Sequence, residues 1–157
     1  MNLPVVRDFM TKHIVALKPD QTMHEALRIL VRNGYSGAPV VEDGKLVGML
    51  SEKDLLRTFT SNLYQTMPEG KVRDHMCTTL TTCAPDDELF DVVEIFFQHS
   101  FRRLPVVENG KMIGIISRSD VVKQCQKIWD EAVPRTDRMM EGLMTPDMRA
   151  MLDDKKS

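Results

Sequence analysis

An internal repeat organises this chain of 157 residues. When the sequence is shifted by 66 positions, residues 6–55 align with residues 72–121 without a gap, and 16 of the 50 aligned pairs are identical. Roughly 3 identities would be expected by chance from ordinary composition. The segment VRDFM pairs with VRDHM, and PVVEDGK pairs with PVVENGK. The repeat therefore predicts one structural unit that is built twice.

Each repeat begins with a short strand candidate and a helix candidate. Residues 13–19 and 79–85 read as short strands that end at a proline. In the helix that follows in repeat one, Thr22 and Glu25 have the spacing of a capping box, and Gly34 suits the C-terminal end. Apolar residues recur with helical spacing in both repeats, which predicts one buried face on each helix. These faces consist of Met23, Ala26, Leu27, Leu30 and Val31, and of Leu89, Val92, Val93, Phe96 and Phe97.

The second half of each repeat reads as a hairpin followed by a helix. Asp43-Gly44 and Asn109-Gly110 separate pairs of apolar runs, and such dipeptides favour a type I′ turn with positive φ at both residues. A helix is expected after Ser51 and after Ser117. The order β-α-β-β-α in each repeat predicts an α+β fold of two tandem units. Because a unit of this size buries little apolar surface alone, we expect the two to pack sheet against sheet as a pseudo-twofold pair.

The boundaries follow from the repeat and from proline. We predict a first unit over residues 1–60, a linker over 61–71, a second unit over 72–133 and a C-terminal helical tail over 134–157. The last helix of repeat two is expected to end near Ala132, because Pro134 follows. The tail is rich in methionine, and its apolar face would either pack on the chain's own core or bind a second subunit or another protein. That face would hold Met140, Leu143, Met144, Met148, Met151 and Leu152.

Composition argues against several classes of function. The formal net charge of −2 provides no general field for a nucleic-acid polymer. No apolar run approaches the roughly 20 residues that span a bilayer, and Arg7 and Asp8 interrupt the N-terminal apolar stretch, which is therefore not a signal peptide. The three cysteines form no C-x-x-C pair, which fits a reducing compartment, so we expect a cytoplasmic protein that does not associate with a membrane.

The sequence does not predict an enzyme. No local motif joins a serine to a histidine and a carboxylate, and no P-loop or dinucleotide fingerprint occurs. A zinc site is the alternative that the cysteines allow, but the spacing of its candidates matches no standard zinc pattern. Those candidates are His75, Cys77, Cys83 and His99. We therefore expect neither a metal nor a catalytic cofactor.

The motif G-h-h-S-x-x-D, in which h is apolar, occurs at residues 48–54 and again at 114–120. Each copy lies where a strand meets a helix, so the serine and aspartate can form an N-terminal capping box. The same junction favours an anion, because free N–H groups and the helix dipole point toward it. Gly48 and Gly114 either let a flat ligand approach the strand or relieve crowding inside the sheet. A cap and a ligand site are therefore both open at this motif.

Taken together, these features resemble a tandem pair of CBS domains, also called a Bateman module. The resemblance rests on the ungapped repeat, the VRDFMT opening, the PVVEDGKLVG hairpin and the doubled G-h-h-S-x-x-D ending, and it covers about residues 4–130. It implies two units packed into a disc with two clefts. In that family the clefts often bind adenine-containing ligands such as AMP, ATP, NAD or S-adenosylmethionine, and the pair usually regulates a partner.

The resemblance also assigns roles to residues, position by position. Asp54 and Asp120 are implied to accept from the ribose hydroxyls, and Ser51 and Ser117 to contact phosphate. A carboxylate can accept from both hydroxyls of a cis-diol, which agrees with the first assignment. Further phosphate candidates are Lys53, Arg102, Arg103 and Ser119. Candidates for contact with the base are Tyr35, Ser36, Gly37 and Phe101.

The two clefts are not expected to be equal. Repeat two has adjacent Arg102 and Arg103 before its hairpin proline, where repeat one has Ser36 and Gly37. We therefore expect the cleft with Asp120 to be the stronger site. The leading hypothesis is a homodimeric sensor of AMP, ADP or ATP that regulates a protein partner in trans or acts through its oligomeric state. The alternatives are NAD or S-adenosylmethionine in the same clefts, a ligand-free interaction module that uses the methionine-rich tail, or an enzyme that uses histidine and cysteine.

Overall fold

The computed structural model describes residues 3–61 and 70–143 of the chain, and for Ser61 and residues 133–143 it describes the backbone alone. The chain divides into two compact units, Met1–Val121 and Val122–Ser157. The first unit contains nearly all of both repeats. The predicted linker over 61–71 and the methionine-rich residues 144–157 lie largely outside the described residues.

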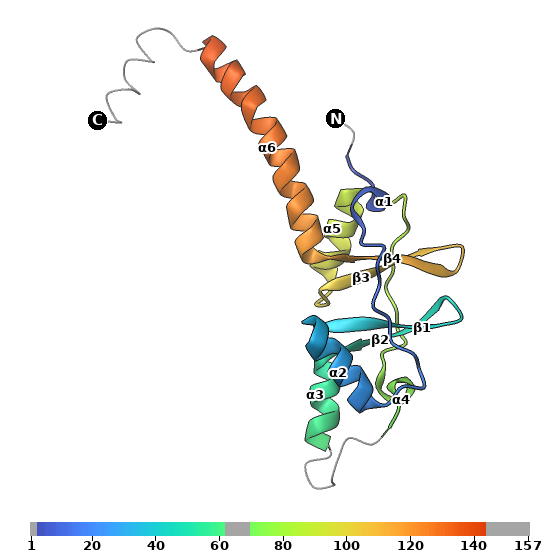
Figure 1. Ribbon diagram of the computed structural model, residues 1–157. Helices are drawn as coiled ribbons and strands as arrows, with labels where there is room; N and C mark the ends of the chain where they lie inside the picture. Colours follow the sequence, from blue (N-terminus) through green and yellow to red (C-terminus); the bar gives the residue numbers. More distant parts are fainter. Residues whose placement is uncertain (1–2, 62–69, 144–157) are drawn as a thin grey trace. The chain divides into compact units, whose positions relative to one another are not determined.

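Repeat one consists of two helices around one hairpin (Figure 1). Helix α2 (Met23–Asn33) precedes strands β1 (Gly37–Glu42) and β2 (Lys45–Ser51), and helix α3 (Glu52–Ser61) follows. The predicted capping box starts α2, since Glu25 N–H donates to Thr22 Oγ1 at 3.2 Å and Thr22 N–H donates to Glu25 Oε2 at 2.8 Å. Gly34 ends the helix in the left-handed conformation, with φ of 64°. Local sequence therefore defines both ends of α2.

Repeat two follows the same order. Helix α5 (Leu89–Gln98) precedes strands β3 (Arg103–Glu108) and β4 (Lys111–Ser117), and helix α6 (Arg118–Leu143) follows. A short helix opens each repeat, α1 (Val6–Phe9) in the first and α4 (Val72–His75) in the second. The predicted end of the last helix is wrong, because α6 continues through Pro134 to Leu143. Proline removes one backbone donor from a helix interior, and here the helix continues without that hydrogen bond.

Both hairpins are confirmed in detail. Strands β1 and β2 form one two-stranded antiparallel sheet, and β3 and β4 form another, with the same irregularity after Val40 and after Val106. In the turns, φ is 51° at Asp43 and 78° at Gly44, and it is 50° at Asn109 and 77° at Gly110. Positive φ at both central residues is what the type I′ turn requires.

The first predicted strand of each repeat is shorter than expected. Residues 13–19 contribute a single parallel bridge between Leu17 and Val40, and residues 79–85 contribute a single bridge between Cys83 and Val106. Prolines explain the shortness. Leu17 N–H donates to Pro39 O at 2.8 Å and Val41 N–H donates to Leu17 O at 2.9 Å, so the next donors along the ladder would be Pro39 and Pro19, and neither has an N–H.

The opening segment of each repeat packs on the other repeat. Val6 N–H donates to Asp87 O at 2.9 Å in repeat two, whereas Val72 N–H donates to Gln21 O at 2.9 Å in repeat one. Figure 1 accordingly shows α1 beside α5, and α4 beside α3. Val6 and Val72 are fully buried, so each repeat completes its core with a valine from the other repeat's opening segment. This exchange ties the two repeats together. The core of repeat one consists of Leu17, Met23, Ala26, Leu30, Ala38, Val40, Leu50, Leu55 and Val72.

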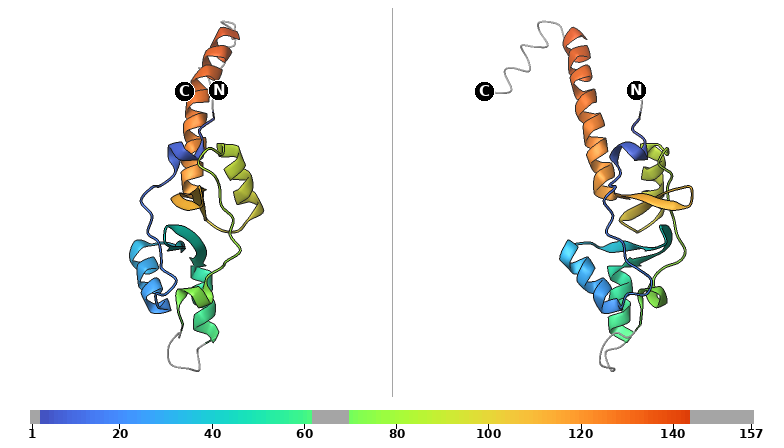
Figure 2. Two further views of the ribbon diagram at one scale, coloured as in Figure 1. Left: turned by 90° about the vertical axis from the view of Figure 1, so that its right-hand side faces the viewer. Right: turned by 45° about the vertical axis from the view of Figure 1, so that its right-hand side comes forward.

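Within this unit the two hairpins lie side by side, with α2 and α3 on one outer side and α5 on the other (Figures 1 and 2). Strand β2 contacts β4, and Met112 N–H donates to Gly44 O at 3.2 Å between the turn regions. The predicted packing of sheet against sheet is therefore present. One part of the helix prediction is wrong, because Val31 and Phe97 are 72% and 81% exposed instead of buried. Both are the last residue of their apolar series, where the buried stripe has already turned away from the core.

A cavity at the start of helix six

The two S-x-x-D motifs have nearly identical geometry. In repeat two, Ser117 donates to Asp120 Oδ2 through its N–H at 2.9 Å and through its hydroxyl at 2.6 Å, and Asp120 N–H donates to Ser117 Oγ at 3.2 Å. In repeat one, the corresponding distances between Ser51 and Asp54 are 2.9, 2.6 and 3.3 Å. Both motifs are therefore capping boxes, as the sequence predicts. Because each carboxylate is held by two donors, its position at the helix start is preorganised.

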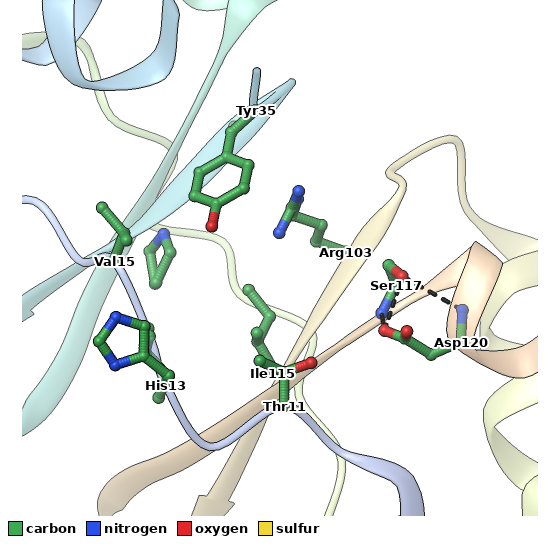
Figure 3. Close-up of a pocket in the computed structure, with 11 residues that line it drawn as sticks. Thr11, His13, Val15, Tyr35, Arg103, Ile115, Ser117 and Asp120 are labelled. Carbon is green, nitrogen blue, oxygen red and sulfur yellow. Dashed lines mark hydrogen bonds between the residues drawn. The ribbon is translucent and has the colours of Figure 1, made fainter. Parts of the chain in front are cut away.

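A cavity of about 200 Å³ opens in front of the motif of repeat two (Figure 3). Ile115, Ser117 and Asp120 form one wall on β4 and α6, while Tyr35 and Pro39 come from repeat one. The segment that crosses between the repeats supplies the remaining wall. Its lining residues are Thr11, His13, Ile14 and Val15. A molecule in this cavity would thus contact both repeats at once.

Arg103 is held over the ring of Tyr35 at one side of this cavity. Its guanidinium carbon lies 4.2 Å from the centre of the ring, which is the geometry of a cation–π contact. No salt bridge joins Arg103 to a carboxylate among the residues that the structure describes. The stacking orders the side chain without neutralising its charge. Arg103 can therefore present a positive charge to an anion in the cavity.

Other predicted residues lie elsewhere. Gly37 lines the cavity with Arg103, but Arg102 is exposed and is not part of the lining. Ser119 borders it through Ser117, with 2.7 Å between the two hydroxyl oxygens. The carbonyl of Ser36 accepts from Glu52 N–H at 3.0 Å.

The remaining candidates lie outside the lining of this cavity. Asp54 Oδ1 lies 4.0 Å from Arg57 Nη1, and Lys53 is exposed. Phe101, the counterpart of Tyr35, stacks on His99 with 4.8 Å between ring centres. The structure therefore brings together Tyr35, Gly37, Arg103, Ser117 and Asp120, and separates from them Ser51, Lys53, Asp54, Arg102 and Phe101.

Methionines occupy the space beside the motif glycines. A Cβ at Gly114 would lie 2.5 Å from Met10 Sδ and 3.3 Å from the carbonyl oxygen of Thr11. A Cβ at Gly48 would meet Met76 in the same way, with Met76 Cγ at 2.8 Å. This packing favours the second interpretation of the glycines, which is relief of crowding. They make room for the opening segment of the other repeat.

Sequence reasoning missed the wall between Thr11 and Val15. No motif marks these residues, and only the exchange of opening segments brings them to Asp120. Thr11 N–H donates to Ile115 O at 2.9 Å and Ile115 N–H donates to Thr11 O at 3.0 Å, which fixes the start of this wall on β4. One feature of the sequence could have indicated this wall. If the two repeats pack as a pair, the segment that leads into one repeat has to run along the other.

Charged residues also join the two repeats. Arg7 Nη2 lies 3.1 Å from Asp86 Oδ1 and 2.9 Å from Glu108 Oε1, and these two acidic groups raise the pKa of Arg7. On the other side, Arg73 Nη2 lies 2.9 Å from Asp20 Oδ1, and the hydrogen bond from Arg73 lowers the pKa of Asp20. Both contacts join an opening segment to the repeat on which it packs.

The three cysteines have different environments. Cys77 is exposed and Cys83 is buried, and burial raises the pKa of the Cys83 thiol to about 12. Within residues 3–61 and 70–143, no group of three or more His, Cys, Asp and Glu side chains is arranged to hold a metal ion. In the same ranges, no helix has the length and apolar character needed to cross a membrane.

Residues 6–61 and 72–127 each match the CBS domain family. The chain belongs to the CBS domain family. The CBS domain-containing protein YhcV of Bacillus subtilis is 34% identical over 117 residues, which cover 74% of this chain and 81% of YhcV. Several other relatives are longer proteins, and this chain spans less than half of their length. The resemblance drawn from the repeat and its motifs is thus confirmed.

Solved CBS pairs have the same fold. The crystal structure of CBSX2, a CBS-pair protein of Arabidopsis thaliana, in complex with AMP has a TM-score of 0.71 and 34% identity, and covers 79% of this chain and 97% of its own. The CBS domain pair of protein MJ0100, from a complex with 5′-methylthioadenosine and S-adenosyl-L-methionine, has a TM-score of 0.70 and 20% identity and covers 80% and 98%. The α+β fold of two tandem units is therefore that of CBS pairs.

Proposed function

We propose that this chain is a regulatory module that binds an AMP-type adenine nucleotide in the cavity in front of Asp120. The observation that carries the proposal is the convergence of a preorganised carboxylate, an ordered arginine and a helix start on one cavity in a CBS pair. The similarity to a CBS-pair protein crystallised with AMP supports the same ligand class.

The chemistry of the cavity assigns a part of the ligand to each group. The carboxylate of Asp120 accepts from the two ribose hydroxyls, because a carboxylate offers about four lone-pair sites and uses only some of them in the cap. Arg103 binds the phosphate, since a guanidinium forms two parallel hydrogen bonds with such a group. The hydroxyl hydrogen of Ser117 already goes to Asp120, so Ser117 acts mainly by holding that carboxylate. Tyr35 and Ile115 contact the base.

Regulation follows from the composition of the cavity walls. Tyr35 and Pro39 belong to repeat one, whereas Arg103 and Asp120 belong to repeat two. A bound nucleotide favours the arrangement in which all of these groups reach it, and so shifts the population of the arrangements of the pair. The output of such a module is the surface that it presents to a partner, with no catalytic step. We place the protein in the cytoplasm, as its cysteine pattern predicts.

A second copy of the chain is the partner that the exposed apolar side chains favour. Val31 on α2, Leu56 and Phe59 on α3, and Phe90 and Phe97 on α5 are at least half exposed. Large apolar side chains exposed on helices are candidates for contact with a second subunit. We propose a homodimer, which light scattering at increasing protein concentration tests. Phe97→Ser should weaken the dimer, and a wild-type protein that stays monomeric at every concentration would exclude it.

Titration calorimetry tests the proposed ligand. AMP, ADP, ATP, NAD and S-adenosylmethionine are titrated into the wild-type protein, and we expect AMP to bind with a Kd well below about 1 mM, equivalent to about −4 kcal/mol. Asp120→Asn keeps an acceptor for the helix cap but loses carboxylate acceptors for the ribose. It should weaken binding about tenfold to a hundredfold, or about 1–3 kcal/mol. Asp54→Asn is the matched control and should have little effect. Equal losses in both variants, or no binding of any nucleotide, would refute the proposal.

A further inference from the structure

His13 lines the cavity on the segment that crosses between the repeats, and no motif of the sequence assigns a role to it. In Figure 3, His13 and Asp120 lie at opposite ends of the open space, with Tyr35 and Arg103 between them at its upper side. No hydrogen bond or salt bridge to either ring nitrogen is present in the part of the chain that the structure describes, and the residue is exposed. Its imidazole is therefore available to a bound molecule.

The imidazole distinguishes this cavity from the equivalent junction in repeat one. At a shift of 66 positions, His13 corresponds to Thr79, and Tyr35 and Gly37 correspond to Phe101 and Arg103. The backbone is repeated, but among these residues only His13 carries an imidazole. His13 thus gives the cavity a property that the fold alone does not provide.

The charges that face His13 make its protonation state important. Arg103 contributes one positive charge to the cavity wall and Asp120 contributes one negative charge. The neighbouring Lys12 is a further cation, exposed outside the lining. The net charge of the side chains that line the cavity is therefore near zero when the imidazole is neutral. It is one positive charge when the imidazole is protonated.

We propose that His13 is a specificity-determining residue that contacts the ligand and selects anionic adenosine compounds, with stronger binding when its ring is protonated. The inference rests on the proposed function, because it concerns the same cavity. Histidine is the side chain whose charge ordinarily changes between about pH 5 and 8. A positive ring favours an anion, so affinity for a phosphorylated ligand rises as the pH falls through this range. A neutral ligand gains nothing from the added charge.

The exposure of His13 limits the size of the effect. Because His13 lines the cavity of about 200 Å³, a nucleotide bound there can reach its ring. Because His13 is exposed, its attraction to a phosphate is screened by water and by salt. We expect a gain in affinity of about threefold to tenfold between the neutral and the protonated ring.

The test uses two probes that do not change charge themselves. The methyl ester of AMP is a phosphodiester and stays singly negative, and adenosine stays neutral. Calorimetry at about pH 7.5 and about pH 5.5 should show the ester binding about threefold to tenfold more tightly to the wild-type protein at the lower pH, with no such change for adenosine. His13→Gln should lose the pH dependence. His24→Gln, which changes an exposed histidine on α2 outside the cavity, should retain it.

The outcomes separate this inference from the proposed function. If both probes bind but His13→Gln keeps the full pH dependence, or if adenosine shows the same dependence as the ester, the role of His13 is refuted and the nucleotide site stands. If neither probe nor AMP binds to the wild-type protein, the proposed function fails as well. Circular dichroism of His13→Gln should match the wild type, because the side chain is exposed.

Discussion

Replacing Gly114 with alanine tests the most specific packing contact of this fold. The added Cβ would lie 2.5 Å from Met10 Sδ, 3.1 Å from Met10 Cγ and 3.3 Å from the carbonyl oxygen of Thr11. The sulfur is at the end of a flexible side chain and can move. The carbonyl cannot move easily, because it accepts from Ile115 N–H at 3.0 Å. The alanine therefore forces Met10 out of its place on β4.

The expected cost follows from two opposing terms. Overpacking of this kind costs about 1–3 kcal/mol. Alanine also reduces the conformational freedom of the unfolded chain, which returns about 0.4–1 kcal/mol. We expect Gly114→Ala to lower the free energy of unfolding by about 1–2 kcal/mol. Gly48→Ala should cost at least as much, because its Cβ would lie 3.1 Å from Met76 Cβ, an atom next to the backbone.

Urea unfolding, followed by circular dichroism, measures this cost. A double-mutant cycle with Met10→Ala isolates the contact, because the alanine at position 114 then has no sulfur to displace. In that background, Gly114→Ala should cost less than about 0.5 kcal/mol. An equal cost in both backgrounds would refute the assignment of the clash to Met10. A variant of unchanged stability that has lost adenosine binding would show instead that Gly114 faces the ligand.

Three further predictions concern the other contacts. Because burial raises the pKa of Cys83 to about 12, iodoacetamide at neutral pH should label exposed Cys77 in the folded protein and leave Cys83 unlabelled until denaturant is added; rapid labelling of Cys83 in the native state would contradict its burial. The hydrogen bond from Arg73 lowers the pKa of Asp20, so their contact stabilises the fold above the unfolded value of about 3.9 and is lost as the pH falls through the lowered pKa. The difference in unfolding free energy between the wild type and Asp20→Asn should therefore shrink below about pH 4, and a difference independent of pH would count against this pair. Thr22→Ala removes the cap of α2 and should lower the unfolding free energy by about 1 kcal/mol, whereas Thr22→Ser should keep most of it.

Features that depend on neighbours in the sequence could be predicted without the structure. The turns at Asp43-Gly44 and Asn109-Gly110, the cap at Thr22 and the boxes at Ser51 and Ser117 all have the expected geometry. Each is decided by hydrogen bonds and φ preferences within about four residues. Because the pattern occurs twice, the same local predictions applied to both repeats. The differences between the two copies also predicted that the two strand-to-helix junctions would differ in charge.

The end of α6 and the first strand of each repeat could not be predicted in the same way. Pro134 marks a common helix end, but a helix can continue through a proline at the loss of one hydrogen bond. Residues 13–19 have a strand pattern, but their ladder depends on donors in β1, and Pro39 lacks one. A propensity describes one segment, whereas a ladder needs both partners.

The sequence alone determined that the chain consists of two like units, where each unit turns and caps its helices, and which carboxylates lie at the helix starts. Only the tertiary structure decided that Met10 fills the space beside Gly114, that Arg103 stacks on Tyr35, and that His13 faces Asp120 across one cavity. The physical reason is the distance along the chain. Contacts between residues 68 to 107 positions apart arise because neither repeat buries enough apolar surface alone. Each repeat therefore completes its core with the other's opening segment, and this brings the crossing residues past the site.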